Sequence, residues 1–352
     1  MTESNEIMQL PERFIDESAL EAFLTAPSPA LIAMMRRIDG DVMILGVAGK
    51  MGVTMAILAA NAIRIAGVTR KVYGVARFSD AESRRKLEEA GVTTIVCDLL
   101  DRDAVRQLPQ IPNIIFMAGR KFGTQGSEDM TWAMNVLAPA YTADHFRKSR
   151  IVVFSTGCVY PLVSAETGGC TEEVAPEPVG EYSQSCLGRE RIFQYGARNH
   201  RTEMLFFRLN YAIDLRYGVL HDIAMPVWKG EKVNNAVSHF NAIWQGCANE
   251  AALRSLEITA NPVNILNVTG PETVSTMEVA EEFGRLFGKK VEYMHPVPGR
   301  RCYLNNAEKM FQLFGRPAVT MRQMIRWQAD WIMHGGKSID KPTHFEVSNG
   351  KF

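Results

Sequence analysis

The first residues whose spacing suits ligand binding are three glycines. Gly46, Gly49 and Gly52 form a G-x-x-G-x-x-G pattern directly after an apolar run that ends at Leu45, and a stretch rich in small residues follows. Glycines in such a turn let backbone N–H groups approach a pyrophosphate at the positive end of the following helix. An ordinary tight turn also uses glycine, but the position between a strand and a helix favours a dinucleotide site.

Two charged residues bear on which dinucleotide is bound. Arg77 follows the second apolar run, where enzymes that use NAD usually carry an acidic residue for the ribose 2′-hydroxyl. An Arg can instead pair with a 2′-phosphate, so NADP is slightly favoured over NAD, and a solvated Arg at a strand end is the alternative. Asp98 follows the third apolar run. It either accepts a hydrogen bond from the adenine amino group or caps the next helix.

Short apolar segments alternate with helical segments between residues 41 and 210. The expected strands lie at 41–46, 71–76, 93–97, 113–117, 150–154 and 204–208, and the first helices between them at 51–66 and 81–90. This alternation is typical of a parallel sheet covered by helices on both faces. We therefore expect an α/β fold with a doubly wound parallel sheet, the Rossmann type, and a smaller C-terminal substrate lobe.

Four regions are expected along the chain. A helical N-terminal extension covers residues 1–40, with apolar residues at helical spacing in 16–24 and 29–38. The dinucleotide-binding domain follows at 41–210. The substrate lobe occupies most of 211–340, except for a late strand at 264–268 that returns to the core, and 341–352 is a tail.

Composition and charge exclude several classes of protein. The 352 residues contain 39 basic and 39 acidic side chains, a balance that argues against a nucleic-acid or membrane-surface partner. No run approaches the ~20 apolar residues of a membrane helix, and the acidic N-terminus lacks the basic region of a secretory signal. The six cysteines show no C-x-x-C pair and the histidines no H-x-x-x-H pair. We therefore expect free thiols in a reducing cytoplasm and no metal site.

A series of short motifs runs along the chain in a set order. These are the glycine pattern, Asp98, Phe116-Met117-Ala118-Gly119, Asn135 within 132–136, Ser155-Thr156-Gly157-Cys158-Val159-Tyr160-Pro161, Tyr182-Ser183-Gln184-Ser185-Cys186, Arg208-Leu209-Asn210 and Asn267-Val268-Thr269-Gly270. Their order over about residues 41–335 resembles the extended short-chain dehydrogenase/reductases, the NAD(P)-dependent epimerase/dehydratase family. The cofactor-binding residues expected from the pattern and the resemblance are Gly46, Gly49, Lys50, Met51, Gly52, Arg77, Asp98, Leu99, Ala118, Gly119, Lys121, Asn135 and Tyr182.

The resemblance also implies a catalytic pair, with one departure. Thr156 stands in the place of the family's catalytic Ser/Thr, and Tyr182 in that of the Tyr in Y-x-x-x-K, but the Lys is Cys186 here. In the family this Lys holds the nicotinamide ribose and lowers the pKa of the Tyr, which a neutral thiol cannot do. Lys121, in the loop after the fourth strand, is either a substitute cation or a surface residue. Cys186 is expected to be an inert small residue.

The leading hypothesis is an enzyme that transfers hydride between NAD(P) and a C–OH of a carbohydrate, which is a sugar, a sugar acid or a nucleotide sugar. It would act as an epimerase or dehydratase, with Tyr182 as acid/base and Thr156 hydrogen-bonded to the reacting oxygen. One alternative is a one-way sugar dehydrogenase or reductase. Another is a non-catalytic dinucleotide-binding protein that has lost its Lys, although retention of Thr156 and Tyr182 argues against it.

The predictions of a substrate site and of a partner depend on the resemblance. Asn210, Arg216, Arg300 and Arg301 lie in segments similar to the family's substrate lobe, where guanidinium groups clamp a diphosphate or carboxylate or are only solvated. A homodimer is expected through the helices that contain 132–143 and 182–195, because the family pairs through a four-helix bundle. The extension either adds to that contact or caps the sheet.

Overall fold

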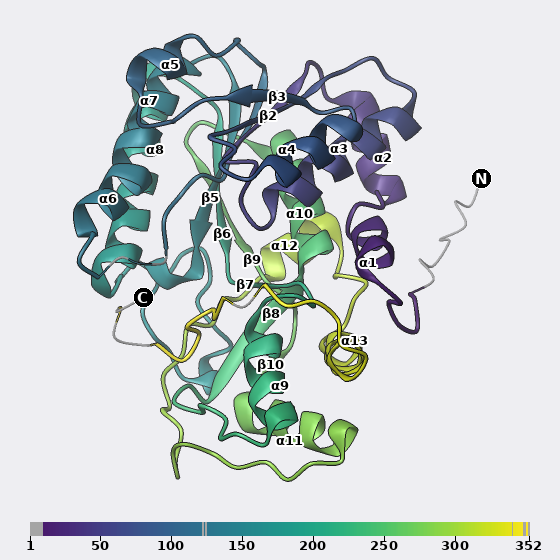
Figure 1. The fold of residues 1–352 in the computed structure, drawn as a ribbon. Helices are drawn as coiled ribbons and strands as arrows, with labels where there is room; N and C mark the ends of the chain where they lie inside the picture. The colour runs from purple at the N-terminus through teal and green to yellow at the C-terminus, as the bar shows by residue number, and fades with distance from the viewer. Residues whose placement is uncertain (1–9, 122, 124, 340, 348–349, 351–352) are drawn as a thin grey trace.

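The computed structural model describes residues 10–121, 123, 125–339, 341–347 and 350 (Figure 1). Its centre is a seven-stranded sheet with the order β3-β2-β1-β4-β5-β6-β9, in which every pair of neighbours is parallel. The strands are β1 (Val42–Leu45), β2 (Val72–Ala76), β3 (Thr93–Val96), β4 (Asn113–Phe116), β5 (Arg150–Thr156), β6 (Met204–Leu209) and β9 (Asn264–Val268). The strand order reverses between β1 and β4, the point at which ligands bind in such sheets.

Helices cover both faces of this sheet (Figure 1). One face carries α2 (Pro29–Arg37), α3 (Gly52–Ala66), α4 (Ala81–Glu89) and α10 (Gln245–Arg254). The other carries α5 (Arg102–Arg106), α6 (Glu128–Trp132), a π-helical turn (Ala133–Leu137), α7 (Ala138–His145) and α8 (Gly180–His200). Because both faces are covered, the central strands are apolar without alternation, and all four side chains of β1 are buried. The expected doubly wound α/β fold is confirmed.

The N-terminal extension packs on its own chain. The first helix, α1 (Glu17–Leu24), is capped by the Asp16 side chain, and α2 is capped by Ser28. Met34 and Met35 of α2 are buried in the core beneath α3. Of the two roles open from the sequence, the structure therefore shows the cap. No single helix of the described residues is long and apolar enough to cross a membrane, and only the pair α1 and α2, bent by 50°, passes that test jointly.

A second layer lies below the sheet in Figure 1. It contains a three-stranded sheet of β10 (Thr273–Ser275), β8 (His239–Trp244) and β7 (Tyr211–Ile213), with the helices α9 (Val219–Lys229), α11 (Thr276–Phe287) and α13 (Met321–Met333). The short helix α12 (Glu308–Phe314) packs beside β9 instead. Single 3-10 turns span Gly157–Val159, Ala165–Thr167 and Ser255–Ile258. Trp244 is buried against Phe14 and Trp327, so it packs the core and does not face a ligand.

The chain after α13 crosses back toward the sheet. Thr343 donates two hydrogen bonds to Asp222 Oδ2 on α9, from its backbone N at 2.7 Å and from Oγ1 at 2.5 Å. Phe345 is buried, with its ring centroid 6.2 Å from that of Phe240. The described part of the predicted tail therefore packs between the lobe and the carboxyl edge of the large sheet.

Candidate active site

The glycine-rich turn connects β1 to α3. Gly46 has a φ of +88°, and a Cβ there would lie 2.7 Å from the backbone N of Ala118. A Cβ on Gly52 would lie 2.3 Å from the carbonyl oxygen of Val47. Both positions therefore require glycine. The helix begins without a side-chain cap at Met51, which leaves the first turn open to an anion such as a pyrophosphate.

Two cavities meet at this turn. The first, of about 250 Å³, is lined by Gly46, Arg77, Asp98 and Leu99, and the second, of about 280 Å³, by Lys50, Met51, Lys121, Thr156 and Tyr182. Gly119 and Met117 line both, and Ala118 lines the first. Together they form a groove along the carboxyl edge of the sheet at the point where the strand order reverses. The residues present therefore suit a dinucleotide, with its adenosine in the first cavity and its reactive end in the second.

Arg77 and Asp98 lie together at the adenosine end. Arg77 Nη1 is 4.0 Å from Asp98 Oδ2, and the Arg77 side chain is 68% exposed. Asp98 Oδ1 accepts a hydrogen bond from the backbone N of Leu100 at 3.0 Å, so one of its oxygens caps the local turn. Strand β2 ends without an acidic residue, and the charged side chain that directly follows it is Arg77.

Thr156, Tyr182 and Lys121 line one cavity although they come from three separate elements. Thr156 ends β5, and its hydroxyl oxygen accepts a hydrogen bond from the backbone N of Cys158 at 3.1 Å. Tyr182 lies in the first turn of α8. The Nζ of Lys121, in the loop after β4, is 5.8 Å from the centre of the Tyr182 ring and donates to the carbonyl oxygen of Thr343 at 3.1 Å. The structure thus places a cation beside the Tyr that lacks its Lys.

Cys186 does not line the cavity. It lies one helical turn after Tyr182, is buried, and packs with Val159, Tyr160 and Cys170. Burial raises the pKa of the Cys186 thiol to about 11, so the thiol stays neutral near pH 7. Burial also raises the pKa of Tyr182 well above its usual value, and Cys186 adds to the rise. A Tyr that must act as a base therefore needs positive charge from another source.

Arg189 is a second cation at the site, and it was not among the residues predicted from the sequence. It lies seven residues after Tyr182 on α8, lines the same cavity, and acts to lower the pKa of Tyr182. Its Nη1 donates to the carbonyl oxygen of Phe154 at 2.8 Å and its Nη2 to Asn135 Oδ1 at 2.6 Å. The sequence pattern that could have indicated Arg189 is its spacing of seven residues from Tyr182, because residues seven apart lie on the same face of a helix.

Asn135 lies beside the groove and does not line either cavity. Its amide bonds the backbone N and O of Arg120, both at 2.9 Å, and also donates to Ser185 Oγ at 2.9 Å. Asn135 was expected to bind the cofactor. The structure instead gives it a supporting role, because its hydrogen bonds hold the loop after β4 against α8.

A buried network lies beneath Thr156 and was not predicted. Ser155 Oγ donates to Glu190 at 2.5 Å, and Glu190 pairs with Arg208 through two bonds of 2.9 and 2.7 Å. Arg208 also donates to the Tyr160 hydroxyl at 2.8 Å, and Tyr160 donates to Asn267 Oδ1 at 2.9 Å. This network joins β5, β6, β9 and α8. It holds the strand ends on which the site is built.

The substrate residues expected from the lobe are only partly at the site. Asn210 lines the second cavity, and its amide donates to Asn241 Oδ1 at 2.6 Å. Arg300 and Arg301 are exposed and line neither cavity, and Arg301 Nε donates to the carbonyl oxygen of Leu162 at 3.0 Å. From the sequence, both either clamp an anionic substrate or are only solvated, and their exposure outside both cavities favours the solvated alternative.

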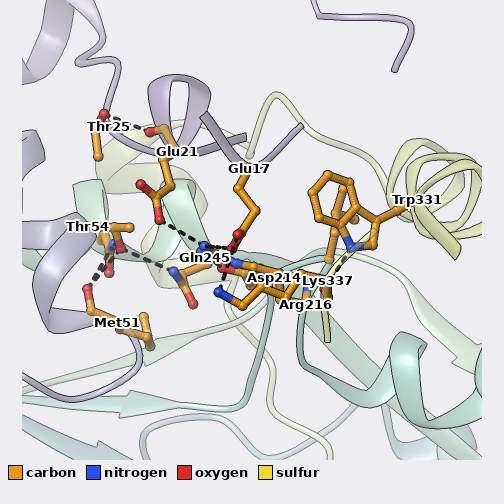
Figure 2. A network of polar contacts seen from close by, with 12 residues as sticks. Glu17, Glu21, Thr25, Met51, Thr54, Asp214, Arg216, Gln245, Trp331 and Lys337 are labelled. Carbon is orange, nitrogen blue, oxygen red and sulfur yellow. Dashed lines mark hydrogen bonds and ion pairs between the residues drawn. The ribbon is translucent and has the colours of Figure 1, made fainter. Parts of the chain in front are cut away.

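Arg216 is held by acidic residues away from the cavity (Figure 2). Its guanidinium donates to Asp214 at 3.0 and 2.7 Å, to Glu21 at 2.9 Å and to Glu17 at 3.3 Å. These bonds tie α1 to the segment after β7, so the structure assigns Arg216 to stability and not to the substrate. Beside it, Gln245 donates to Thr54 Oγ1 at 3.2 Å and joins α10 to α3 (Figure 2).

Two tyrosines and a lysine also line the cavity of Tyr182. Tyr211 and Tyr217 line the cavity, and the Nζ of Lys50 is 3.1 Å from the centre of the Tyr217 ring. Neither tyrosine belongs to a motif, and only the fold brings them to the site. Among the residues that the structure describes, no three His, Cys, Asp or Glu side chains gather as a metal site requires.

The site combines a glycine-rich turn, at the point where the strand order reverses, with a Tyr and a Thr that line the same groove. This combination can be compared with known protein families. Residues 42–212 match the model of the NAD dependent epimerase/dehydratase family. The match covers 171 of the 352 residues. The resemblance inferred from the motifs is therefore confirmed over β1 to β7, which carry Thr156 and Tyr182. A search of proteins with curated function finds no match.

Solved structures of epimerases and dehydratases share the fold of this chain. The UDP-glucuronic acid 4-epimerase of Bacillus cereus in complex with NAD is 15% identical, with a TM-score of 0.68 over 83% of this chain and 98% of that one. The dTDP-glucose 4,6-dehydratase of Bacillus anthracis in complex with NAD is 17% identical, with a TM-score of 0.70 over 84% and 97%. The Thermus thermophilus UDP-glucose 4-epimerase complex with NAD is 20% identical, with a TM-score of 0.66 over 82% and 98%.

Proposed function

We propose that the protein is an NAD(P)-dependent enzyme that transfers hydride at a C–OH of a carbohydrate and works as an epimerase or dehydratase. The observation that supports this most is the shared cavity of Thr156 and Tyr182, which continues through Gly119 into the glycine-rich groove. A nicotinamide bound there supplies the hydride acceptor and donor.

Each residue of the site has a distinct part in this proposal. Tyr182 takes the proton from the reacting hydroxyl and later returns it, and Thr156 holds the same oxygen by a hydrogen bond. Lys121 supplies the positive charge that favours the phenolate of Tyr182, since Cys186 cannot. Arg189 adds a second positive charge near Tyr182. It is a positioning residue, because its guanidinium donates to Phe154 and Asn135.

NADP is the cofactor we propose in preference to NAD. The support is the Arg77 guanidinium at the adenosine end and the absence of an acidic residue at the end of β2. A guanidinium forms charge-assisted hydrogen bonds with a phosphate, whereas a ribose hydroxyl is better met by a carboxylate. The three solved structures above were obtained with NAD, so this preference would separate the protein from them.

We also propose a homodimer through α6, the π-helical turn and α8. Trp132, Leu137 and Tyr195 on these elements are exposed apolar residues, with Tyr195 59% exposed. Both segments were expected from the family's four-helix bundle. Apolar side chains that gather on neighbouring helices are suited to burial against a second copy.

Two other functions compete with this proposal. A one-way dehydrogenase or reductase would use the same residues and differ only in releasing the changed cofactor. A dinucleotide-binding protein without catalysis is favoured by the Cys186 substitution alone, because the thiol is neutral and buried.

A substrate screen with a Tyr182→Phe control tests all three. Wild-type protein should turn over at least one sugar, sugar acid, sugar phosphate or nucleotide sugar. Tyr182→Phe should lower that rate by about 10²- to 10⁴-fold, because Phe keeps the packing and loses the proton. Cofactor affinity, measured by calorimetry, should change little. Accumulation of reduced cofactor would indicate the dehydrogenase, and isomerised product without it the epimerase. No turnover with any substrate class would overturn the enzyme proposal.

A further inference from the structure

The cavity that holds Thr156 and Tyr182 has a strongly one-sided charge. Four cationic side chains line it, namely Lys50, Arg120, Lys121 and Arg189, and no carboxylate does among the residues that the structure describes. The two arginines are bonded within the protein, Arg189 as given above and Arg120 by donating to the carbonyl oxygen of Gly123 at 2.9 Å. The other two cations are the ammonium groups of Lys50, which lies over the Tyr217 ring, and of Lys121, which donates to the carbonyl oxygen of Thr343.

Lys50 belongs to the glycine-rich turn, yet its side chain serves the other cavity. Gly46 and Gly49 of the turn line the adenosine cavity, whereas Lys50 lines only the cavity of Tyr182. Its Nζ lies over the Tyr217 ring at 3.1 Å, a cation–π contact that holds the ammonium at the lining of the cavity that Lys121 also lines. Lys50 thus faces the region where the reacting molecule would lie.

The surroundings of Lys50 contain more positive than negative charge. Lys121 and Lys341 repel it, and Asp222 attracts it, but Asp222 Oδ2 already accepts two hydrogen bonds from Thr343. Glu346 is the other nearby acid and acts on Lys121. Burial and this repulsion lower the pKa of Lys50 to about 7. An anion bound between the two ammonium groups would relieve both effects.

The size of the cavity limits what that anion can be attached to. Its volume of about 280 Å³ is at the lower end of the ~300–1,000 Å³ usual for ligand pockets, and under the proposed function the nicotinamide end shares it. Tyr211, Tyr217 and Thr343 close it on the lobe side. Arg216, Arg300 and Arg301, the cations expected to clamp a diphosphate, lie outside it. One sugar unit fits this description better than a sugar with a nucleotide.

We propose that the substrate is a small carbohydrate with a carboxylate or phosphate on the sugar itself, and that Lys50 binds this group while the reacting hydroxyl faces Tyr182 and Thr156. The inference rests on the proposed function and narrows its substrate class. The main competing hypothesis is that Lys50 binds the pyrophosphate of the cofactor.

The test compares four ligand classes on the full-length protein in the presence of oxidised cofactor. Calorimetric affinity and turnover are measured for neutral sugars, sugar acids, sugar monophosphates and nucleotide sugars. We expect sugar acids or monophosphates to bind best, and which of the two does so identifies the anion. Lys50→Met should weaken that ligand by about 10- to 100-fold, the usual effect of losing a charge-assisted hydrogen bond. Lys50→Arg should recover most of the affinity.

Matched controls separate the competing outcomes. Lys232→Met, which removes an exposed charge of the lobe, should leave every affinity unchanged. Lys50→Met should not weaken neutral sugars or the cofactor. An equal loss of cofactor affinity would overturn the proposal in favour of the pyrophosphate, and best binding of neutral or nucleotide sugars would overturn it as well. If a sugar acid or monophosphate binds through Lys50 but is never turned over, the substrate class stands and the enzyme proposal fails.

Discussion

Replacing Lys121 by Met removes the cation proposed to stand in for the missing Lys. The Nζ of Lys121 lies 5.8 Å from the centre of the Tyr182 ring. If this distance is taken for the phenolate charge, with an effective dielectric constant of about 20, Coulomb's law gives a stabilisation of about 3 kcal/mol. That energy corresponds to about two pKa units, so the pH at which activity rises should move about two units upward in Lys121→Met. At pH 7 the rate should fall by about 10- to 100-fold.

The dependence of the activity on pH shows whether the charge of Lys121 acts on Tyr182. The pKa of Tyr182 is raised, so its base form is scarce at neutral pH and becomes more abundant as the pH increases. Burial lowers the pKa of Lys121, so its ammonium is lost at alkaline pH. The ratio of wild-type to Lys121→Met activity should therefore be largest near neutral pH and shrink as the pH rises.

The assay is a series of initial rates across pH, with cofactor affinity measured separately. Lys121→Arg should recover the neutral-pH rate, because it keeps the charge. Lys148→Met removes an exposed cation far from the cavity and should leave the profile unchanged. A uniform loss of rate at every pH would show that Lys121 only positions the loop through its bond to Thr343, and the reasoning about Tyr182 would be refuted.

Three further outcomes are expected. Arg77→Ala should weaken NADP binding by about 10- to 100-fold in a fluorescence titration and leave NAD nearly unchanged; tighter binding of NAD than of NADP by the wild type would contradict the preference. Arg216→Met strands the buried carboxylate of Asp214, so urea denaturation should show a loss of about 3–5 kcal/mol in unfolding free energy, and a loss below about 1 kcal/mol would mean that the network in Figure 2 contributes little. Tyr195→Glu should convert a dimer to monomer in light scattering, and a monomeric wild type at micromolar concentration would refute the proposed interface.

Local patterns were enough to predict the central elements of the fold. Strand β1 and helix α3 follow from an apolar run, a glycine-rich turn and a run of small residues, all of which are neighbours in the chain. The structure has α3 at Gly52–Ala66, where 51–66 was expected, and β2 at Val72–Ala76, where 71–76 was expected. Such boundaries depend on hydrogen bonds and burial over a few residues, which the sequence displays directly.

The roles of individual charges could not be predicted in the same way. Arg216 was expected either to clamp a substrate or to be solvated, but Glu17 and Glu21, almost 200 positions earlier, bind its guanidinium. Arg189 was not predicted because its partners, Asn135 and Phe154, lie on other elements. A long cationic side chain has many rotamers, and the acceptor it reaches depends on which distant segments fold against it.

The sequence by itself determined the parallel α/β architecture and the glycine-rich turn between β1 and α3, because these are properties of neighbouring residues. The tertiary structure alone decided that Lys50 and Lys121 share a cavity with Tyr182, and that Thr343 from the far end of the chain closes it. These residues lie between about 60 and 220 positions apart in the chain. Only the packing of the sheet, lobe and C-terminal segment brings such residues together, and no local pattern records it.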